Sequence, residues 1–284
     1  MAQFTNQAQL SYNNATVNSN VAVGEVLEVL SANKTAVTTT YAQGGDITYV
    51  ISAVNSGATP IGGITVTDNL GAYMFGETTL YPLTYKDGSV RLYINGVLQA
   101  APIVVAGPPL VVSGITLPAN SNMVLIYEAN VNTFAPLGDE DSIINIATVS
   151  GNGISTPITV TETVTPISEA MLDITKSISP VPVAENGVVT YTFVIRNSGN
   201  APADTSANVT LTDTFNPILS DLTVLLNGVA LAEGTGYTYA VTEGDFATVP
   251  GVITVPAATY AQDPVSGVWS VTPGTTTLTV TGTI

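Results

Sequence analysis

Apolar and polar residues alternate in short runs along the whole chain. The runs at residues 46–54 and 276–281 are rich in Val, Ile, Thr and Tyr, and Gly, Pro and Asn separate such runs. A period of two is typical of β-strands with one buried face, and no stretch carries the period of a helix. Asn95-Gly96 and Asn227-Gly228, each between apolar runs, predict tight hairpin turns. The pattern predicts an all-β chain.

The strand pattern occurs twice. A Lys, a Tyr and an Asn-Ser-Gly triplet of the first copy recur 142 residues later (176 − 34). They are Lys34, Tyr49 and Asn55-Ser56-Gly57, which recur as Lys176, Tyr191 and Asn197-Ser198-Gly199. Asp68 recurs as Asp213 at an offset of 145 (213 − 68), so the second copy carries an insertion of three residues. We therefore expect two tandem β-sandwiches with Greek-key connections.

The two copies differ at their ends. The first closes with an Asn-x-Ala-Thr-Val strand at residues 145–149, whereas the second matches the first only to about Val131. Residues 4–17 align with 143–156 at an offset of 139 (145 − 6). We expect the second sandwich to lack its last strand, which the N-terminus carries instead. The expected parts are an N-terminal donor strand and linker (1–24), a complete sandwich (25–165) and an incomplete sandwich (166–284).

The N-terminal segment is expected to complete the second sandwich of a neighbouring chain. An open sandwich edge exposes apolar side chains and unpaired backbone groups, and an extended segment from another chain can fill it. A head-to-tail contact of this kind builds filaments. The alternatives are a disordered arm and a strand that folds back onto its own second domain. The expected polymerisation residues are Phe4, Asn6, Ala8, Leu10, Tyr12, Val17, Val21 and Val23.

The repeated motifs carry a family resemblance. The order Lys-Thr, Gly-Asp-x-Thr-Tyr-x-Ile, Asn-Ser-Gly and Thr-Val-Thr-Asp resembles a conserved surface-protein repeat family, the domain of unknown function eleven. The likeness covers roughly residues 26–164 and 168–284, with Val188 in place of Asp46. The chain is also similar to the ribbon-appendage subunits of clostridial endospores. The resemblance implies an immunoglobulin-like structural protein on a Gram-positive cell or spore.

Strand parity places polar residues on apolar faces. They form two sets, Lys34, Asp68 and Asn145 in the first copy, and Lys176, Asp213 and Asn6 across a subunit junction. Lone buried charges are costly, so each set is expected to be paired. Resemblance to isopeptide-forming surface domains implies a Lys–Asn bond within each set, with the Asp moving protons. The alternatives are a salt bridge and an Asn that caps a turn.

Charge and composition remove several classes of function. With 5 Lys+Arg against 21 Asp+Glu, the net charge of −16 leaves no basic surface for nucleic acid. The chain has no Cys and no His, which excludes the common nucleophilic triads and zinc sites. The acidic residues 139–141 are more typical of a solvated turn than of a Ca²⁺ loop. We expect no enzyme activity, no cofactor and no metal.

The sequence thus favours a structural subunit of an extracellular filament or spore appendage. Its expected partners are identical or paralogous subunits. The longest apolar stretch, residues 101–117, is broken by Pro and Gly, so no membrane insertion is expected, and no Sec-type signal is visible at the start. The alternative is a surface adhesin or glycan-binding module with tandem immunoglobulin-like stalk domains, whose external ligand the sequence does not identify.

Overall fold

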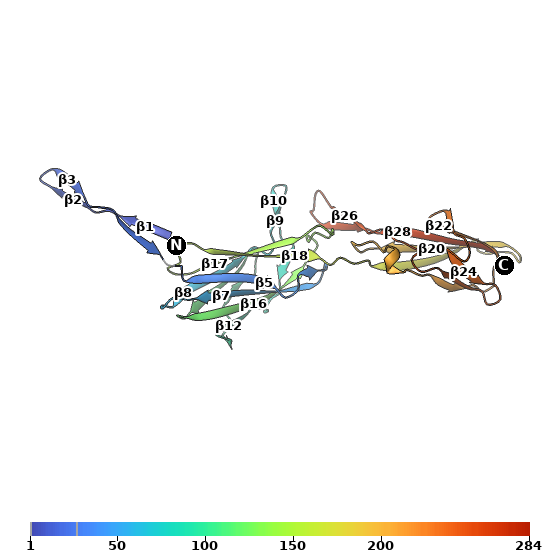
Figure 1. Ribbon diagram of the computed structural model, residues 1–284, viewed down its shortest axis with the longest axis horizontal. Helices are drawn as coiled ribbons and strands as arrows, with labels where there is room; N and C mark the ends of the chain where they lie inside the picture. Colours follow the sequence, from blue (N-terminus) through green and yellow to red (C-terminus); the bar gives the residue numbers. More distant parts are fainter. Residues whose placement is uncertain (1, 27) are drawn as a thin grey trace. The chain divides into compact units, whose positions relative to one another are not determined.

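The computed structural model describes residues 2–26 and 28–284 (Figure 1). In these residues every regular element is a β-strand except one 3₁₀ turn, η1 (Thr205–Ala207), which confirms the all-β prediction. No helix in the described part of the chain is long and apolar enough to cross a membrane. The chain divides into two compact units. The first contains the residues up to Ala135 and Ile143–Val164, and the second contains Pro136–Ser142 and Thr165–Ile284.

The chain begins with a long hairpin of four short strands (Figure 1). They are β1 (Ala2–Asn6), β2 (Gln9–Tyr12), β3 (Ala15–Asn18) and β4 (Ala22–Val26). β1 pairs antiparallel with β4, and β2 with β3. Asn13 and Asn14 make the turn with φ of 44° and 63°, a region that Asn adopts more readily than most residues. The single extended strand expected here is therefore a hairpin with two arms, β1–β2 and β3–β4.

The first sandwich consists of two six-stranded sheets. One has the order β13-β12-β16-β7-β5, with β11 also paired to β16, and the other has the order β14-β15-β8-β17-β18-β6. The strands of the first sheet are β5 (Leu30–Ala36), β7 (Asp46–Asn55), β11 (Leu83–Tyr85), β12 (Arg91–Ile94), β13 (Val97–Leu98) and β16 (Ser121–Val131). Those of the second are β6 (Thr40–Tyr41), β8 (Ile61–Asp68), β14 (Ile103–Val105), β15 (Leu110–Leu117), β17 (Ile143–Ser150) and β18 (Ile158–Pro166). A small ladder joins β9 (Tyr73–Phe75) and β10 (Thr78–Leu80).

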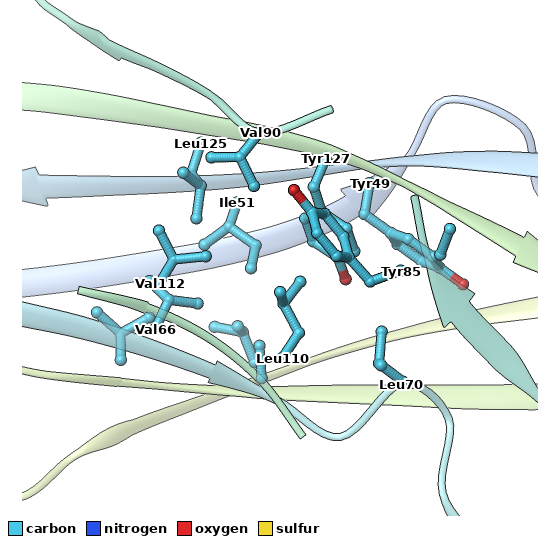
Figure 2. Close-up of a cluster of buried hydrophobic side chains, with 14 of the residues drawn as sticks. Tyr49, Ile51, Val66, Leu70, Tyr85, Val90, Leu110, Val112, Leu125 and Tyr127 are labelled. Atoms are coloured by element: carbon cyan, nitrogen blue, oxygen red, sulfur yellow. The ribbon is translucent and has the colours of Figure 1, made fainter. Parts of the chain in front are cut away.

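The core of the first sandwich lies between these sheets. Alternation along each strand sends one set of side chains inward, as along β7 and β16. Figure 2 shows Ile51 and Leu125 facing Val66 and Val112 of the other sheet. Beside them, the rings of Tyr49 and Tyr127 stack with centroids 5.4 Å apart (Figure 2). Hydrophobic burial of this kind is the main force that holds two sheets face to face.

The second unit repeats this plan with fewer strands. Its larger sheet has the order β19-β20-β28-β22-β23, and a three-stranded sheet has the order β21-β25-β24. The larger sheet contains β19 (Leu172–Ser179), β20 (Val188–Asn197), β22 (Ser220–Leu226), β23 (Val229–Ala230) and β28 (Gly274–Thr283). The remaining strands are β21 (Thr212–Thr214), β24 (Tyr237–Ala240), β25 (Asp245–Thr248), and the ladder of β26 (Thr259–Gln262) with β27 (Trp269–Thr272). Phe215 and Phe246 lie in its core, with ring centroids 5.9 Å apart.

Strand pairing confirms the internal repeat. Leu30 lies opposite Asn55 in the β5–β7 ladder, and Leu172 lies opposite Asn197 in the β19–β20 ladder. Both hairpin turns predicted from Asn-Gly pairs are also confirmed. In each of them both residues have positive φ, between 48° and 80°, and they join β12 to β13 and β22 to β23.

Candidate functional site

Strand β8 of the first sandwich has a partner on each edge. Its residue Asp68 lies opposite Leu110 of β15 on one side and Ala147 of β17 on the other. β17 then pairs with β18 from Ile143 to Val149, so these two strands form a hairpin that extends the sheet. The β17–β18 hairpin thus supplies the closing strands of the complete sandwich.

The corresponding strand of the second unit has a partner on one edge. Asp213 of β21, at the position of Asp68, lies opposite Phe246 of β25. Within the part of the chain that the structure describes, no strand pairs with the other edge of β21. An unpaired strand edge offers a row of free N–H and C=O groups to another chain. This edge therefore corresponds to the place that β17 occupies in the first sandwich.

A groove accompanies the open edge. A cavity of about 340 Å³ lies between β19 and the segment that leads into β21. Its apolar lining comprises Leu172, Ile174, Ile195, Val209 and Leu211. The equivalent positions of the first sandwich are Leu30, Ala32, Ala53, Ile64 and Val66. In that sandwich β17 lies against β8, and Val149 of β17, which is fully buried, lies opposite Val66.

Exposure changes sharply between the equivalent residues of the two first strands. Leu30 is 7% exposed, whereas Leu172 is 41% exposed and Ile174 is 54% exposed. Exposed apolar side chains grouped along one groove mark an interaction surface, because burying them from water is favourable. The groove therefore has the geometry and the apolar lining of a site for one further strand.

In the first sandwich, the predicted polar set is buried and hydrogen-bonded. Lys34 Nζ donates to Asp68 Oδ2 at 2.6 Å, and neither side chain is more than 1% exposed. The hydroxyl of Tyr127 also donates to Asp68 Oδ2 at 2.6 Å, and Lys34 Nζ lies 4.9 Å from the centre of the Tyr49 ring. Two donors on one carboxylate offset the cost of removing its charge from water.

Burial shifts the ionisation of this set. Desolvation lowers the pKa of Lys34 to about 8, although the charge of Asp68 and its hydrogen bond act in the opposite direction. Burial is also the largest cause of a pKa of Tyr127 well above its usual value, and the nearby Asp68 charge adds to it. Lys34 thus holds its proton less firmly than a solvated lysine.

Asn145 belongs to the same cluster, but Lys34 contacts its backbone and not the side-chain amide that an isopeptide bond would use. Its backbone carbonyl accepts from Lys34 Nζ at 3.1 Å. Its side-chain Oδ1 accepts from the Gly71 N–H at 3.3 Å, and its Nδ2 donates to the Tyr127 hydroxyl at 3.1 Å. A bond from Lys34 Nζ to the Asn145 side-chain carbonyl carbon would break the C–N bond of the amide and release one ammonia. That bond stays a prediction, which intact mass would test.

In the second unit, the equivalent ion pair is open to solvent. Lys176 Nζ pairs with Asp213 Oδ2, but the Lys176 side chain is 42% exposed, against 0% for Lys34. Its Nζ lies over the rings of Tyr191 and Phe215, at 4.7 and 5.6 Å from their centres. The structure therefore brings Lys176 and Asp213 together without the strand that buries the first pair.

The predicted polymerisation residues lie in the N-terminal hairpin, and every one of them is exposed. They are Phe4, Asn6, Ala8, Leu10, Tyr12, Val17, Val21 and Val23. Leu10 lies opposite Val17 in the β2–β3 ladder, so these two share a face. Val23 lies opposite Thr5, on the other face from Phe4, because strand residues alternate between faces. Val21 lies between the β1–β4 and β2–β3 ladders, whose pairing registers differ by one residue.

The repeated Asn-Ser-Gly triplet has a structural role that sequence reasoning did not assign. Asn55 is fully buried, and its Nδ2 donates to the carbonyls of Thr59 and Pro118 at 2.9 and 2.8 Å. Asn197 makes the same bonds to Ala201 and Pro256, at 2.8 and 3.1 Å. Each Asn thus joins two loops at one end of its sandwich. The signal was the recurrence of an Asn at the end of an apolar strand.

The acidic turn is held by its own atoms. Asp141 Oδ2 accepts from the Gly138 N–H at 2.8 Å. In the described residues, no group of three or more His, Cys, Asp or Glu side chains has an arrangement that could hold a metal ion.

Comparisons with known proteins give structural similarities only. No family model matches the chain, and no curated protein matches it. The major pilin subunit of Bacillus cereus aligns with 11% identity and a TM-score of 0.40, over 96% of this chain and 73% of that one. The pilus backbone of Streptococcus pneumoniae aligns with 11% identity and a TM-score of 0.35, over 86% and 55%. A C-terminal fragment of the major pilin of Streptococcus agalactiae aligns with 11% identity and a TM-score of 0.35, over 78% and 79%. At these values the similarities assign no function.

Proposed function

We propose that the protein is a non-enzymatic structural subunit of an extracellular filament that polymerises head to tail. The N-terminal segment of one subunit fills the open edge of the second domain in the next. The observation that carries the proposal is the apolar groove beside β21, at the place where β17 closes the first sandwich. The N-terminal segment follows the β17 pattern at a constant offset of 139 (145 − 6) and exposes its apolar side chains.

The first sandwich supplies the register of the proposed contact. There, Ala147 lies opposite Asp68 and Val149 lies opposite Val66. Transferred by the repeat offsets, Ala8 of one subunit lies opposite Asp213 of the next. Leu10 then lies opposite Leu211 and occupies the groove. Asn6 takes the place of Asn145, whose backbone carbonyl accepts from the buried lysine.

Two contributions favour this contact. Moving Leu10 from water into an apolar groove contributes roughly 1.5–3 kcal/mol, and backbone bonds to the free edge of β21 add register. The new strand also covers Lys176 and Asp213, as β17 covers Lys34 and Asp68. The salt bridge already exists in the free subunit, so the donor strand does not have to create it.

The location proposed for the filament is the surface of a bacterial cell or spore. Support comes from the resemblance of the Lys, Tyr and Asn-Ser-Gly landmarks to surface-protein repeats. The size and the two-repeat layout of the chain are also similar to those of clostridial spore-appendage subunits. The partners are further copies of this chain or close paralogues. A net charge of −16 makes the subunits repel one another, so they associate only through surfaces that are complementary in shape and apolar.

Leu10→Asp tests the proposed contact. A carboxylate in the groove would be buried without a partner, which costs about 3 kcal/mol or more and raises the concentration needed for polymer about 100-fold. The matched control is Gln9→Asp, which introduces the same side chain on the adjacent residue, on the opposite face of the strand. Sedimentation over a concentration series and negative-stain microscopy measure both variants.

Equal polymerisation by the two variants would contradict the proposed contact. If the unmodified chain stays monomeric at every concentration, a filament subunit is excluded and the stalk of a surface adhesin becomes the better account.

A further inference from the structure

The N-terminal hairpin has two chemically different faces. In the β1–β4 ladder, Phe4 lies opposite Gly24 and Asn6 lies opposite Ala22. In the β2–β3 ladder, Leu10 lies opposite Val17 and Tyr12 lies opposite Ala15. Directly opposite residues of an antiparallel ladder share a face, so each of the two ladders has one largely apolar face of small and large side chains. Asn6 is the one amide among the residues just named.

The opposite side of each ladder is mostly polar and is held by side-chain bonds, although it also carries Val23, which lies opposite Thr5 and is exposed. Gln3 Nε2 donates to Glu25 Oε1 at 3.1 Å, and Gln9 Nε2 donates to Asn18 Oδ1 at 3.1 Å. Between the ladders, the Ala8 and Ser19 backbones pair through the Ser19 N–H and the Ala8 carbonyl at 2.8 Å. The two arms are thus joined from end to end before any partner arrives.

Close packing on the apolar face involves both arms. A Cβ at Gly24 would lie 2.3 Å from Cζ of Phe4, so the ring of Phe4 lies directly on the Gly24 backbone. A side chain at this position would displace the ring from the backbone. The side chains of the apolar face are nevertheless open to solvent, with Phe4 57%, Leu10 65% and Tyr12 56% exposed. A face of this composition is an interaction surface that the hairpin itself does not cover.

The first sandwich shows how such a hairpin is used. β17 and β18 pair antiparallel over seven residue pairs from Ile143 opposite Val164 to Val149 opposite Ile158. Both arms contribute to the core, since Ala147 and Val149 of β17 and Val160 and Val164 of β18 are buried. The second arm then leads into β19, the first strand of the next repeat, as β4 leads into β5. The closing element of this fold is a hairpin and not a lone strand.

We propose that the donor is the whole N-terminal hairpin, which docks as a preformed two-stranded unit on the second domain of another copy of this chain. The inference rests on the proposed function. The β1–β2 arm lies beside β21, and the β3–β4 arm becomes the outer strand of the extended sheet. The apolar face with Phe4, Leu10 and Val17 turns inward, and the polar face with Gln3 and Gln9 stays in water. The hairpin does not open during assembly.

Disulfide locking of the hairpin tests this inference, and the chain has no cysteine of its own. The variant Gln9→Cys/Asn18→Cys places two thiols at directly opposite positions on the polar face, and Gln3→Cys/Glu25→Cys does the same in the outer ladder. Each variant is oxidised as a monomer at low concentration, shown to be closed by intact mass, and then concentrated. The same variant kept reduced is the control.

Docking of the whole hairpin predicts that at least one oxidised variant forms filaments with no loss relative to its reduced form. If both variants form filaments only when reduced, the donor strand has to leave its hairpin partner, and the inference is overturned. A wild-type chain that forms no polymer would contradict the proposed function and the inference together. Normal filaments from a chain without residues 1–24 would likewise contradict both. A failure that appears only in the oxidised variants contradicts the whole-hairpin inference and leaves the proposed function standing.

Discussion

Removal of residues 1–24 abolishes filament formation and leaves a folded monomer. Among the residues whose burial the structure describes, the first in either core is Leu30, which lies beyond this segment, so neither sandwich loses packing. What disappears is the donor for the open edge of β21. Negative-stain microscopy and sedimentation measure the loss of polymer, and hydrogen exchange of core peptides verifies that the sandwiches are intact.

The shortened chain also has a predicted effect on the wild-type protein. It keeps the groove beside β21 but has no hairpin to donate, so it accepts one neighbour and ends the filament there. Substoichiometric amounts are expected to shorten wild-type filaments in proportion to their mole fraction. The matched control is the same truncation with Ile174→Asp, which places a carboxylate at an exposed position of the groove and removes the capping effect. Filaments of unchanged length in both mixtures would contradict a head-to-tail contact through this edge.

Asp68→Ala strongly destabilises the first sandwich, whereas Asp213→Ala has little effect on the second in the unpolymerised chain. The first substitution leaves Lys34 buried without its carboxylate, and breaking a buried ion pair in this way costs about 3–5 kcal/mol. The second leaves Lys176 in partial contact with water, where an ion pair contributes about 0–1 kcal/mol.

Domain-resolved hydrogen exchange is the appropriate measurement, because a two-domain chain has no single free energy of unfolding. Peptides from β7 and β16 are expected to lose protection in Asp68→Ala. In the unpolymerised Asp213→Ala chain, peptides from β20 and β28 are expected to keep their protection. Lys34→Met combined with Asp68→Ala removes both charges and is expected to restore much of the lost protection. Equal losses of protection in the two single variants would contradict this account, because they would mean that the Lys176–Asp213 pair is as buried as the Lys34–Asp68 pair.

Much of this structure follows from local patterns that a sequence displays. The period of two along residues 46–54 determines which side chains of β7 turn inward, and the repeat places Lys176 at the position of Lys34. Asn-Gly pairs specify hairpin turns through their tolerance of positive φ, which made the turns at Asn95 and Asn227 predictable.

Other features depend on geometry that no local pattern encodes. The turn of the N-terminal hairpin is Asn13-Asn14, without the glycine that signals most such turns, and its arms join residues about twenty positions apart in the sequence. The contact of the Tyr127 hydroxyl with Asp68 crosses from one sheet to the other, so it depends on the spacing between the sheets. Strand parity shows that both side chains turn inward, but not that they meet.

The most direct test of the account is a cross-link between two different chains. Ser11 of one chain is predicted to lie opposite Thr210 of the next, by transfer of the pair Ser150 and Thr65 in the first sandwich. Ser11→Cys and Thr210→Cys are prepared as separate single-cysteine chains, mixed and oxidised. The account predicts a disulfide-linked heterodimer, and little product when Thr212→Cys replaces Thr210→Cys, because a shift of two residues separates the thiols beyond bonding distance. No heterodimer with Thr210→Cys, or equal yields with both positions, would contradict it.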